Sequence, residues 1–444
     1  MELTKLRNAA REIFESALAA ADARQAVLRV LKLEPNSLRL FDEDIHLSAA
    51  TRIYGVAIGK AGAAMAAGLE DIFGPRIRGV LSCPPSDLEA ALDRDRWRVV
   101  YGGHPVPNMN SLLAAHTIRR SLELANQDDS LIIFLVSGGG SAMLEWPAAE
   151  NITLEDLIDA NRQLISCGAT IAEVNSVRRA FSGVKGGKLA RFAPHAHQIS
   201  LIVSDTNPGE EVEVASGPTF DAPTDGYDPN QVIERYNLSK SMPQSIMMAL
   251  DQNKTSTRIA YPSQRIRRHF VIADNHTALQ AAATTAARLG FIVEIADDIR
   301  EQEVSEGCHL MLSRLQALSN HSGAQPVCLL SGGEFSCPVR GDGLGGRNSE
   351  IVLRCAIEMG KNRVDGLRNT VFLSGGTDGI DGKSSAAGAI GDETTIERAR
   401  SLGLKAEDFL QRSDSFRFFT ILGDAVTTGP TGTNVRDVRV LLSD

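Results

Sequence analysis

Three runs of apolar residues in this chain each end in the tripeptide Ser-Gly-Gly. The runs cover residues 131–136, 327–330 and 371–373, and each is typical of a strand buried in a parallel sheet. Ligands of open α/β sheets bind at the carboxyl ends of such strands, where glycine lets backbone N–H groups approach an anion. A single Ser-Gly-Gly is more simply explained as an ordinary turn after a strand. Three of them predict a site that holds a polyphosphate or a small carboxylate.

The third of these strand ends also carries two carboxylates. Asp378 and Asp381 lie in the short sequence Thr-Asp-Gly-Ile-Asp-Gly, directly after the glycines. Carboxylate oxygens are hard ligands that suit Mg²⁺ or Mn²⁺. Phosphate-binding glycines beside such ligands predict a site for phosphates and Mg²⁺, with these two aspartates as the metal ligands.

Length and composition place the chain among soluble α/β proteins. Its 444 residues are too many for one core of usual size, so we expect two domains, or at most three. The low aromatic content, 5%, favours α/β layers over an all-β protein. A net charge of -9 argues against a nucleic-acid partner, because such proteins usually present a basic face.

The cysteines and the N-terminal segment indicate a compartment. Six cysteines are scattered without a Cys-x-x-Cys pair, a pattern typical of reduced thiols and not of a disulfide framework or a zinc site. Residues 1–33 carry acidic and basic side chains every few positions, unlike a signal peptide, and no later segment approaches about 20 uninterrupted apolar residues. We therefore expect a cytoplasmic protein with no membrane partner.

Strand and helix patterns alternate along the chain. Strands are predicted at 52–58, 79–82, 97–101, 131–136 and 198–203, with helical patterns between most of them. This alternation predicts an α/β fold whose first domain is a doubly wound, mostly parallel, Rossmann-like sheet. Residues 216–245 are rich in Pro, Asp, Gly and Asn, and are the best candidate for a linker. We therefore expect one α/β domain at 1–240 and a second at 241–444.

Two basic residues stand in glycine loops that precede predicted helices. Lys60 follows the first strand of the sheet, where the N–H groups of a helix start attract anions. Its loop is neither a phosphate-binding Walker A loop nor a Gly-x-Gly-x-x-Gly turn, which weakens a nicotinamide-dinucleotide hypothesis. Arg347 follows a dense run of glycines, and its guanidinium could bind a carboxylate or a phosphate in bidentate fashion. The alternatives are a solvated lysine at a helix start and, for Arg340 and Asp342, simple turn residues.

Other loops offer weaker candidates. Asp205 places a carboxylate at a predicted strand end. Residues 427–434 form a hydroxyl-rich loop, which could also be a tight turn before the last strand. His104, in a Gly-Gly-His-Pro-Val-Pro sequence, is the one histidine whose loop suggests a site, so a histidine general base has only weak support.

Taken in order, these loops resemble those of the MOFRL-type glycerate kinases, also called class II or glycerate 2-kinases, over nearly the whole chain. The shared motifs read GVAIGKAG, GGHPVPN, FLVSGGGSAMLEWP, LIVSDTNPGEEVEVASGPT, LLSGGE, GLGGRNSE, FLSGGTDGIDG and TTGPTGTNVRDV. The resemblance implies ATP-dependent phosphorylation of D-glycerate to 2-phosphoglycerate, with a divalent metal, in a cleft between two α/β domains of which the second is MOFRL-type. The chain is also similar to proteins labelled hydroxypyruvate reductase.

The resemblance also assigns roles to residues. It implies that Lys60 and Arg347 hold the glycerate carboxylate and the transferring phosphoryl group, that Asp205 orients or deprotonates the 2-hydroxyl, and that Asp378 and Asp381 bind Mg²⁺. The residues expected to bind ATP are Ser137, Gly138, Gly139, Gly140, Ser141, Gly332, Gly333, Glu334, Asn348, Gly375, Gly376, Thr433 and Asn434.

Two other functions stay open at this point. An NAD(P)H-dependent hydroxypyruvate reductase would be an oxidoreductase, and the absence of the dinucleotide fingerprint from the sequence speaks against it. A non-catalytic sensor of a sugar acid or a nucleotide would use the same loops, because binding and catalytic loops share residue types. A turnover assay separates the sensor from both enzymes. The sequence leaves the oligomeric state open, including a homo-oligomer.

Overall fold

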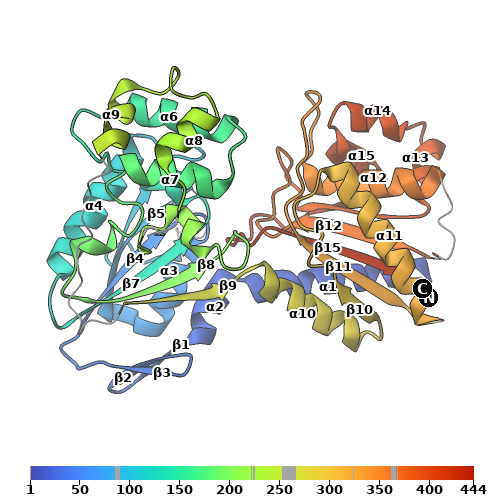
Figure 1. Cartoon of the computed structure of the whole chain (residues 1–444). Coiled ribbons are helices and arrows are strands. Elements are labelled where there is room, and N and C mark those ends of the chain that lie inside the picture. The colour runs from blue at the N-terminus through green and yellow to red at the C-terminus, as the bar shows by residue number, and fades with distance from the viewer. Residues whose placement is uncertain are drawn as a thin grey trace. The chain divides into compact units, whose positions relative to one another are not determined.

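The computed structural model of the chain describes residues 2–85, 91–221, 223, 226–252, 267–323, 325–361, 367 and 369–444 (Figure 1). Its contacts divide the chain into two compact units. One is Ala23–Ile272, called here the central unit, and the other is Met1–Asp22 with Ala273–Asp444, called here the terminal unit. Each contains a six-stranded β-sheet with helices packed on it, so the expected architecture of two α/β domains is confirmed.

The division between the units differs from the one expected at residue 240. The first helix belongs with the terminal unit, where Phe14 and its neighbours are buried. Residues 216–245, expected as a linker, contain helix α8 (Pro229–Arg235) and the start of α9 (Gln244–Gln252). Val232 and Ile246 pack into one core with Leu157 and Val177, so this Pro- and Gly-rich stretch is part of the central unit.

The central unit is built on a six-stranded sheet. Its order is β6 (Trp97–Tyr101), β5 (Ile77–Cys83), β4 (Arg52–Ile58), β7 (Ser130–Ser137), β8 (His197–Val203) and β9 (Arg267–Ala273). The pairs from β6 through β8 are all parallel, as the alternating pattern predicted. The chain moves outward from β4 to β6 and then returns to β7 on the other side of β4. The point between β4 and β7 is therefore the topological switch point, where α/β sheets bind ligands.

Helices cover both faces of this sheet. Val56 and Phe134 point to the face on which α4 (Met109–Ala125) packs through Ala114 and Ile118. On α3 (Gly62–Phe73), a Cβ placed on Gly62 would lie 3.0 Å from Leu81 Cδ1, so this helix lies close to the sheet. The remaining elements of the unit are α2 (Ala23–Val30), η1 (Gly74–Arg76), α5 (Gly140–Met143), α6 (Leu154–Ser166), α7 (Ile171–Phe181), η3 (Ala190–Phe192), η4 (Glu211–Ser216), and an antiparallel sheet of β1 (Leu31–Glu34), β2 (Ser37–Leu40) and β3 (Glu43–His46).

The terminal unit has a mixed six-stranded sheet. Its order is β10 (Ile292–Ile295), β11 (Val327–Gly333), β15 (Asp437–Ser443), β12 (Val371–Gly376), β13 (Gly388–Asp392) and β14 (Ala425–Val426). β10 and β11 are parallel, whereas β15 is antiparallel to both of its neighbours, β11 and β12. β11 and β12 consequently run in the same direction, and Gly333 and Gly376 both pair with Asp437.

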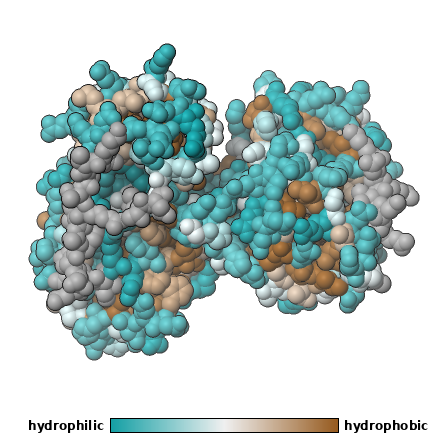
Figure 2. All heavy atoms as spheres, in the orientation of Figure 1, coloured by the Kyte–Doolittle hydropathy of each residue, from teal (hydrophilic) through white to brown (hydrophobic). Residues whose placement is uncertain are grey.

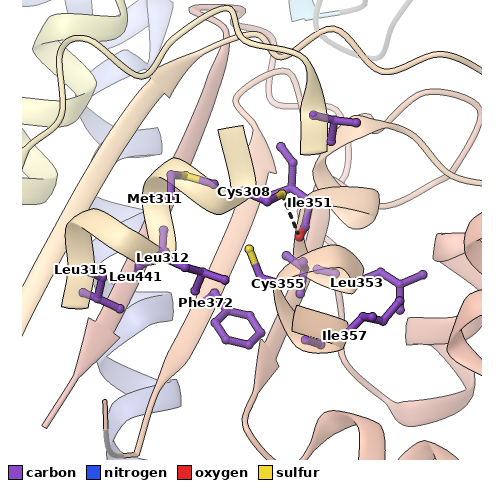
Figure 3. Close-up of a cluster of buried hydrophobic side chains, with 14 of the residues drawn as sticks. Cys308, Met311, Leu312, Leu315, Ile351, Leu353, Cys355, Ile357, Phe372 and Leu441 are labelled. Atoms are coloured by element: carbon purple, nitrogen blue, oxygen red, sulfur yellow. Dashed lines mark hydrogen bonds between the residues drawn. The ribbon is translucent and has the colours of Figure 1, made fainter. Parts of the chain in front are cut away.

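The two faces of this second sheet are covered by different helices. α1 (Leu3–Ala21) packs on one face, where a Cβ on Gly375 would collide with the Phe14 ring, and α10 (Asn275–Arg288) packs beside α1. On the other face, α11 (Val304–Ser322) and α12 (Arg347–Lys361) bury a cluster that includes Met311, Phe372 and Leu441 (Figure 3). The last helices are α13 (Thr395–Ser401), α14 (Ala406–Gln411) and α15 (Ser415–Leu422).

The surface agrees with the composition. On the face shown in Figure 2, hydrophilic residues cover most of the molecule and hydrophobic residues appear in separate patches. Among the described residues, no helix is both long and apolar enough to cross a membrane.

Candidate active site

The first cluster of predicted site residues lies at the switch point of the central unit. Lys60 follows β4 and Ser137 ends β7, so the parallel pairing brings the two loops together. The Lys60 N–H donates to the Gly138 carbonyl at 2.9 Å, and the Ala61 N–H donates to Ser137 Oγ at 3.0 Å. Gly59 could not carry a side chain, because a Cβ there would lie 2.4 Å from the Ser137 carbonyl oxygen. The Ser137 side chain therefore fixes the loop, and does not point into an open ligand site.

Two further side chains border the same glycines. A Cβ on Gly138 would lie 1.8 Å from Asp205 Oδ2, so the carboxylate that follows β8 lies directly over that glycine. Gly139 has φ +79°, and a Cβ there would lie 3.4 Å from both Lys60 Cγ and His104 Cε1. Lys60, His104 and Asp205 thus come from the ends of three different strands and surround one glycine loop. Carboxyl ends of parallel strands gather residues in this way.

A buried polar network supports the loop from behind. Ser141 Oγ lies 2.6 Å from Ser216 Oγ, which in turn donates to Asn175 Oδ1 at 2.7 Å. Asn175 and Arg179 both donate to Glu213 Oε2, at 2.8 and 2.7 Å. Every one of these groups except Ser141 is buried, and a buried, fully paired network favours one conformation of the loop. Ser141, expected to bind the nucleotide, is held by this network.

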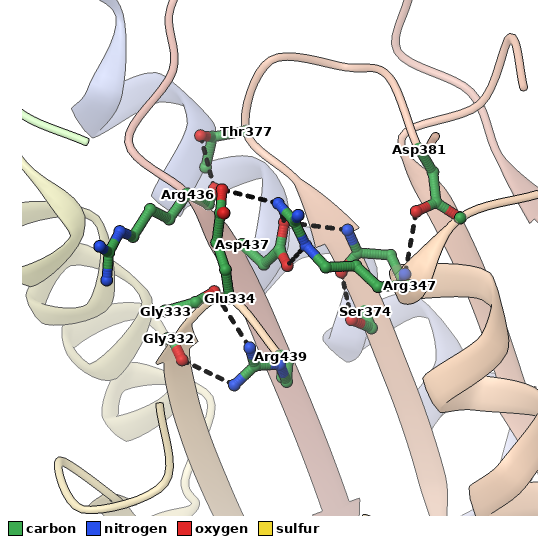
Figure 4. Close-up of polar contacts among 12 residues, drawn as sticks. Gly332, Gly333, Glu334, Arg347, Ser374, Thr377, Asp381, Arg436, Asp437 and Arg439 are labelled. Carbon is green, nitrogen blue, oxygen red and sulfur yellow. Dashed lines mark hydrogen bonds and ion pairs between the residues drawn. The ribbon is translucent and has the colours of Figure 1, made fainter. Parts of the chain in front are cut away.

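The second cluster lies in the terminal unit and is centred on Arg347 (Figure 4). The guanidinium of Arg347 donates to Asp437 through Nε at 2.5 Å and Nη2 at 3.2 Å, and Nη2 also lies 2.7 Å from Glu334 Oε1. Asp437 is 1% exposed and Arg347 is 32% exposed. Although burial alone lowers the pKa of Arg347, the carboxylates of Asp437 and Glu334 raise it above its usual value. Arg347 is therefore a fixed, permanent cation at the end of the sheet.

Asn348 and Asp381 organise the start of α12 beneath this arginine. The Asp381 carboxylate accepts from the Asn348 and Ser349 N–H groups, both at 2.9 Å, and from Ser349 Oγ at 2.6 Å. Asn348 Nδ2 donates to Asp437 Oδ1 at 2.9 Å. Burial raises the pKa of Asp381, although the hydrogen bonds from Ser349 and Asn348 oppose that shift. Its expected role as a metal ligand stays a prediction, and a cation would compete with these bonds.

The second Ser-Gly-Gly does not form a loop after the strand as expected, because β11 continues through Gly333 while it pairs with β15. The buried Arg439 side chain donates to the carbonyls of Gly332 and Gly333, at 2.6 and 3.0 Å. Asn275 Oδ1 accepts from the Gly333 N–H at 3.2 Å. These hydrogen bonds hold both glycines in place, so their backbone groups stabilise the end of β11, directly before Glu334.

The third Ser-Gly-Gly, at the end of β12, differs between its two glycines. Gly375 makes room for Phe14, as described above, whereas Gly376 borders the cluster. A Cβ on Gly376 would lie 3.2 Å from Asp378 Oδ1 and 3.5 Å from Asp437 Oδ1. Asp378 is half-buried, and its Oδ1 also accepts from the Ile380 N–H at 3.1 Å. The structure thus brings Asp378 and Asp437 to one end of the sheet.

The C-terminal loop residues have structural contacts. Thr433 is buried and donates through Oγ1 to the Ala21 carbonyl at 2.7 Å, which ties the loop to the end of α1. Asn434 Oδ1 accepts from the Arg436 N–H at 3.2 Å. Their expected part in nucleotide binding stays a prediction.

Asp437 was not among the residues expected at the site, although it connects Arg347, Asn348 and both glycine-ended strands. Asp437 begins an apolar strand, and a charge at a strand start is usually a solvated residue. Arg439 is a second charged residue, two positions later, and side chains at this spacing lie on the same face of a strand. This spacing of two charged residues was the signal in the sequence that could have pointed to Asp437. The groups that Asp437 and Arg439 contact follow only from the antiparallel pairing of β15 with β11 and β12.

The capping role of Asp381 gives a prediction about stability. Asp381→Ala removes three hydrogen bonds and leaves the buried N–H groups at the start of α12 without an acceptor. We expect the free energy of unfolding to fall by about 1–3 kcal/mol, from the costs of a lost cap and of unsatisfied donors. Urea denaturation measures this, with Asp342→Ala in the nearby exposed loop as the matched control. An unchanged midpoint would show that the cap contributes nothing.

Comparison with known proteins identifies the family of the chain. One family model, described as a domain of unknown function, DUF4147, matches residues 9–251, and the MOFRL family model matches residues 327–437. A glycerate 2-kinase of Pyrococcus horikoshii is 32% identical to the chain, over 96% of this chain and 94% of its own length. The chain belongs to the MOFRL-type glycerate 2-kinase family. This confirms the family that the loop motifs indicated.

Other members of the MOFRL-type glycerate 2-kinase family extend the comparison. The crystal structure of a glycerate kinase from Thermotoga maritima matches with a TM-score of 0.81 at 29% identity, over 99% of this chain and all of its own, 100%. An Agrobacterium vitis relative is 34% identical, over 98% of this chain and 94% of its own length, and carries the provisional name of a hydroxypyruvate reductase. Both labels that the motifs suggested are therefore found among the relatives.

Proposed function

We propose that this protein is a glycerate 2-kinase that transfers the γ-phosphoryl group of ATP to the 2-hydroxyl of D-glycerate. Two relatives named glycerate 2-kinase and D-glycerate 2-kinase, which match 96% and 88% of this chain, support the proposal. The observation that carries the proposal is the fixed guanidinium of Arg347, which the buried Asp437 orients where β11 and β12 end. A planar cation held in place before the reaction is suited to a transferring phosphoryl group.

The proposal gives each cluster a part in one reaction. The glycine loop at Gly138 and Gly139, with Lys60, binds anionic groups of the substrates, and Asp205 orients the acceptor hydroxyl. Arg347 stabilises the charge that develops on the phosphoryl oxygens. The hydroxyl oxygen forms a bond to the γ-phosphorus while the bond from that phosphorus to the β,γ-bridging oxygen breaks, so ADP leaves with the electron pair. Catalysis of this kind depends mainly on positioning and electrostatics. The location of the site in a cleft between the domains stays a prediction.

Mg²⁺ is part of the proposal, and the donor set near Gly376 fits it. Asp378 supplies hard carboxylate oxygens there, whereas Asp437 beside it already accepts from Arg347 and Asn348. Mg²⁺ is usually held by one or two carboxylates together with substrate phosphates. The described residues contain no group of three or more His, Cys, Asp or Glu side chains that could hold a metal by itself. A metal bound in this way would neutralise charge on the ATP phosphates.

The metal assignment leads to a second prediction. EDTA should abolish activity and added Mg²⁺ should restore it, and Asp378→Asn should raise the Mg²⁺ concentration needed for half-maximal rate by roughly tenfold or more, because one charged ligand is lost. The measurement is initial rate against free Mg²⁺ for wild type and variant, with Asp342→Asn as the control. If Asp378→Asn keeps the wild-type rate and metal requirement, Asp378 is a turn residue only.

The reductase is the second candidate function, because a relative carries that name. The turn after β4, from Gly59 to Gly62, has no Gly-x-Gly-x-x-Gly sequence, so the usual pyrophosphate-binding turn is missing at the switch point. The deciding experiment supplies purified protein with ATP, Mg²⁺ and D-glycerate in one reaction and with NADH or NADPH and hydroxypyruvate in another. We expect glycerate-dependent ADP formation and no oxidation of either nucleotide. Rapid NADH oxidation without ADP formation would refute the kinase, and absence of both would favour a sensor.

A further inference from the structure

One titratable side chain at the glycine loop has no role in the mechanism above. His104 follows β6, in the loop that leads to α4, and its imidazole borders Gly139 on the same side as Lys60. It is exposed, and among the described residues it makes no hydrogen bond to the protein. The half-buried His269 differs, because its ring lies 3.0 Å from the Thr219 carbonyl and stacks on Phe220. Both ring nitrogens of His104 thus remain for a ligand.

The surroundings of His104 keep the imidazole uncharged at neutral pH. Partial desolvation by the loop, followed by the positive charge of Lys60, lowers the pKa of His104 below 6.5. The two neighbouring helices add no negative charge, because α5 consists of Gly-Ser-Ala-Met and α4 has no acidic residue in its first turn. The acidic group beside this loop is Asp205, which follows β8 and borders Gly138. A neutral imidazole can accept a proton, and a base works best when its pKa lies near the working pH.

We propose that His104 is the group that accepts the proton of the acceptor hydroxyl during phosphoryl transfer. The inference rests on the proposed kinase function and adds a base to it. As the hydroxyl oxygen bonds to the γ-phosphorus, its proton moves to the free ring nitrogen of His104, and the imidazolium then releases that proton to water. Asp205, the carboxylate beside Gly138, orients the hydroxyl.

The test uses the full-length protein and two kinds of measurement. In kinetics, His104→Gln should lower kcat by roughly 100-fold, within the range typical of a lost general base, and should change KM for D-glycerate little. The wild-type profile of kcat/KM against pH should fall on the acid side below about pH 6.5 as His104 becomes protonated, and this acid limb should disappear in His104→Gln. In Asp205→Asn the acid limb should persist. His116→Gln, an exposed histidine on α4 that stacks on Trp146, is the matched control.

The second measurement does not need turnover. NMR titration should show an imidazole with a lowered pKa that is missing from His104→Gln, whereas the lowered pKa of His269, caused mainly by burial, should remain in that variant. Lys60→Met should raise the pKa of His104 because a repelling charge is lost. An unshifted His104 titration, or a His104→Gln variant with the wild-type kcat and acid limb, would overturn the inference while leaving the kinase in place. If the wild-type protein forms no ADP with glycerate, the proposed function fails, and the inference fails with it.

Discussion

Replacement of Arg347 by alanine should lower kcat by roughly 100-fold or more, the loss seen when a preorganised charge stabiliser is removed. In the structure this guanidinium is held by two bonds to Asp437 and one contact to Glu334, so it needs little reorganisation when charge develops on the phosphoryl group. Its effect should therefore be larger in the transition state than in ground-state binding, and KM should change less than kcat. Steady-state kinetics with ATP and D-glycerate measure both.

Two further variants separate charge from geometry at this position. Arg347→Lys should recover little of the lost rate, because a lysine cannot reproduce the fork that engages Asp437 and a ligand together. Arg340→Ala removes a more exposed arginine of the same loop and should keep the wild-type kcat. Since Asp437 loses its cation in Arg347→Ala, circular dichroism and urea denaturation must show that each variant is folded. A folded Arg347→Ala variant with near-normal kcat would contradict the assigned role.

Replacement of Lys60 by alanine should also lower kcat by roughly 100-fold. Its backbone is fixed by the hydrogen bond to Gly138, and its side chain borders Gly139, so its charge is placed at the switch point of the sheet. The helix that follows adds the partial positive charge of its N-terminus to the same place. Loss of the lysine should reduce the rate more than it weakens ATP or glycerate binding. The measurement is the same set of kinetic constants.

The control for Lys60 is Lys32→Ala, which removes an exposed lysine of the same unit from β1. It should leave kcat and both KM values unchanged. Retention of normal kcat by Lys60→Ala would show that this lysine is only a solvated residue at the start of α3 and has no part in the transfer.

The sequence predicted the first cluster well because its parts are local. An unbroken apolar run predicted β7, and the glycines after it and the lysine after β4 follow directly in the chain. Parallel alternation then places the ends of both strands at one edge of the sheet. Lys60 and Gly138 therefore could be expected to meet, and they do.

The second cluster could be predicted only in part, because it depends on pairing between distant strands. β15 inserts between β11 and β12 in antiparallel orientation, which no local pattern reveals, and this insertion extends both strands through their glycines. It also makes Asp437 the partner of Arg347. Asp381 also accepts hydrogen bonds from the N–H groups of Asn348 and Ser349 at the start of α12, a contact between distant segments that the local sequence does not reveal. The residue types in the sequence therefore indicated that charged groups such as Arg347 and Asp381 belong to a site. Their contact partners could be identified only from the folded structure.

The most direct test of the proposed function is the identity of the product. The purified protein is incubated with ATP, Mg²⁺ and D-glycerate, and the products are identified by ³¹P and ¹H NMR. We expect ADP and 2-phosphoglycerate in equal amounts, with the phosphorus coupled to the proton on C2. Accumulation of 3-phosphoglycerate, with coupling to the C3 protons, would contradict the 2-kinase, and absence of any glycerate-dependent phosphoester would contradict the kinase altogether.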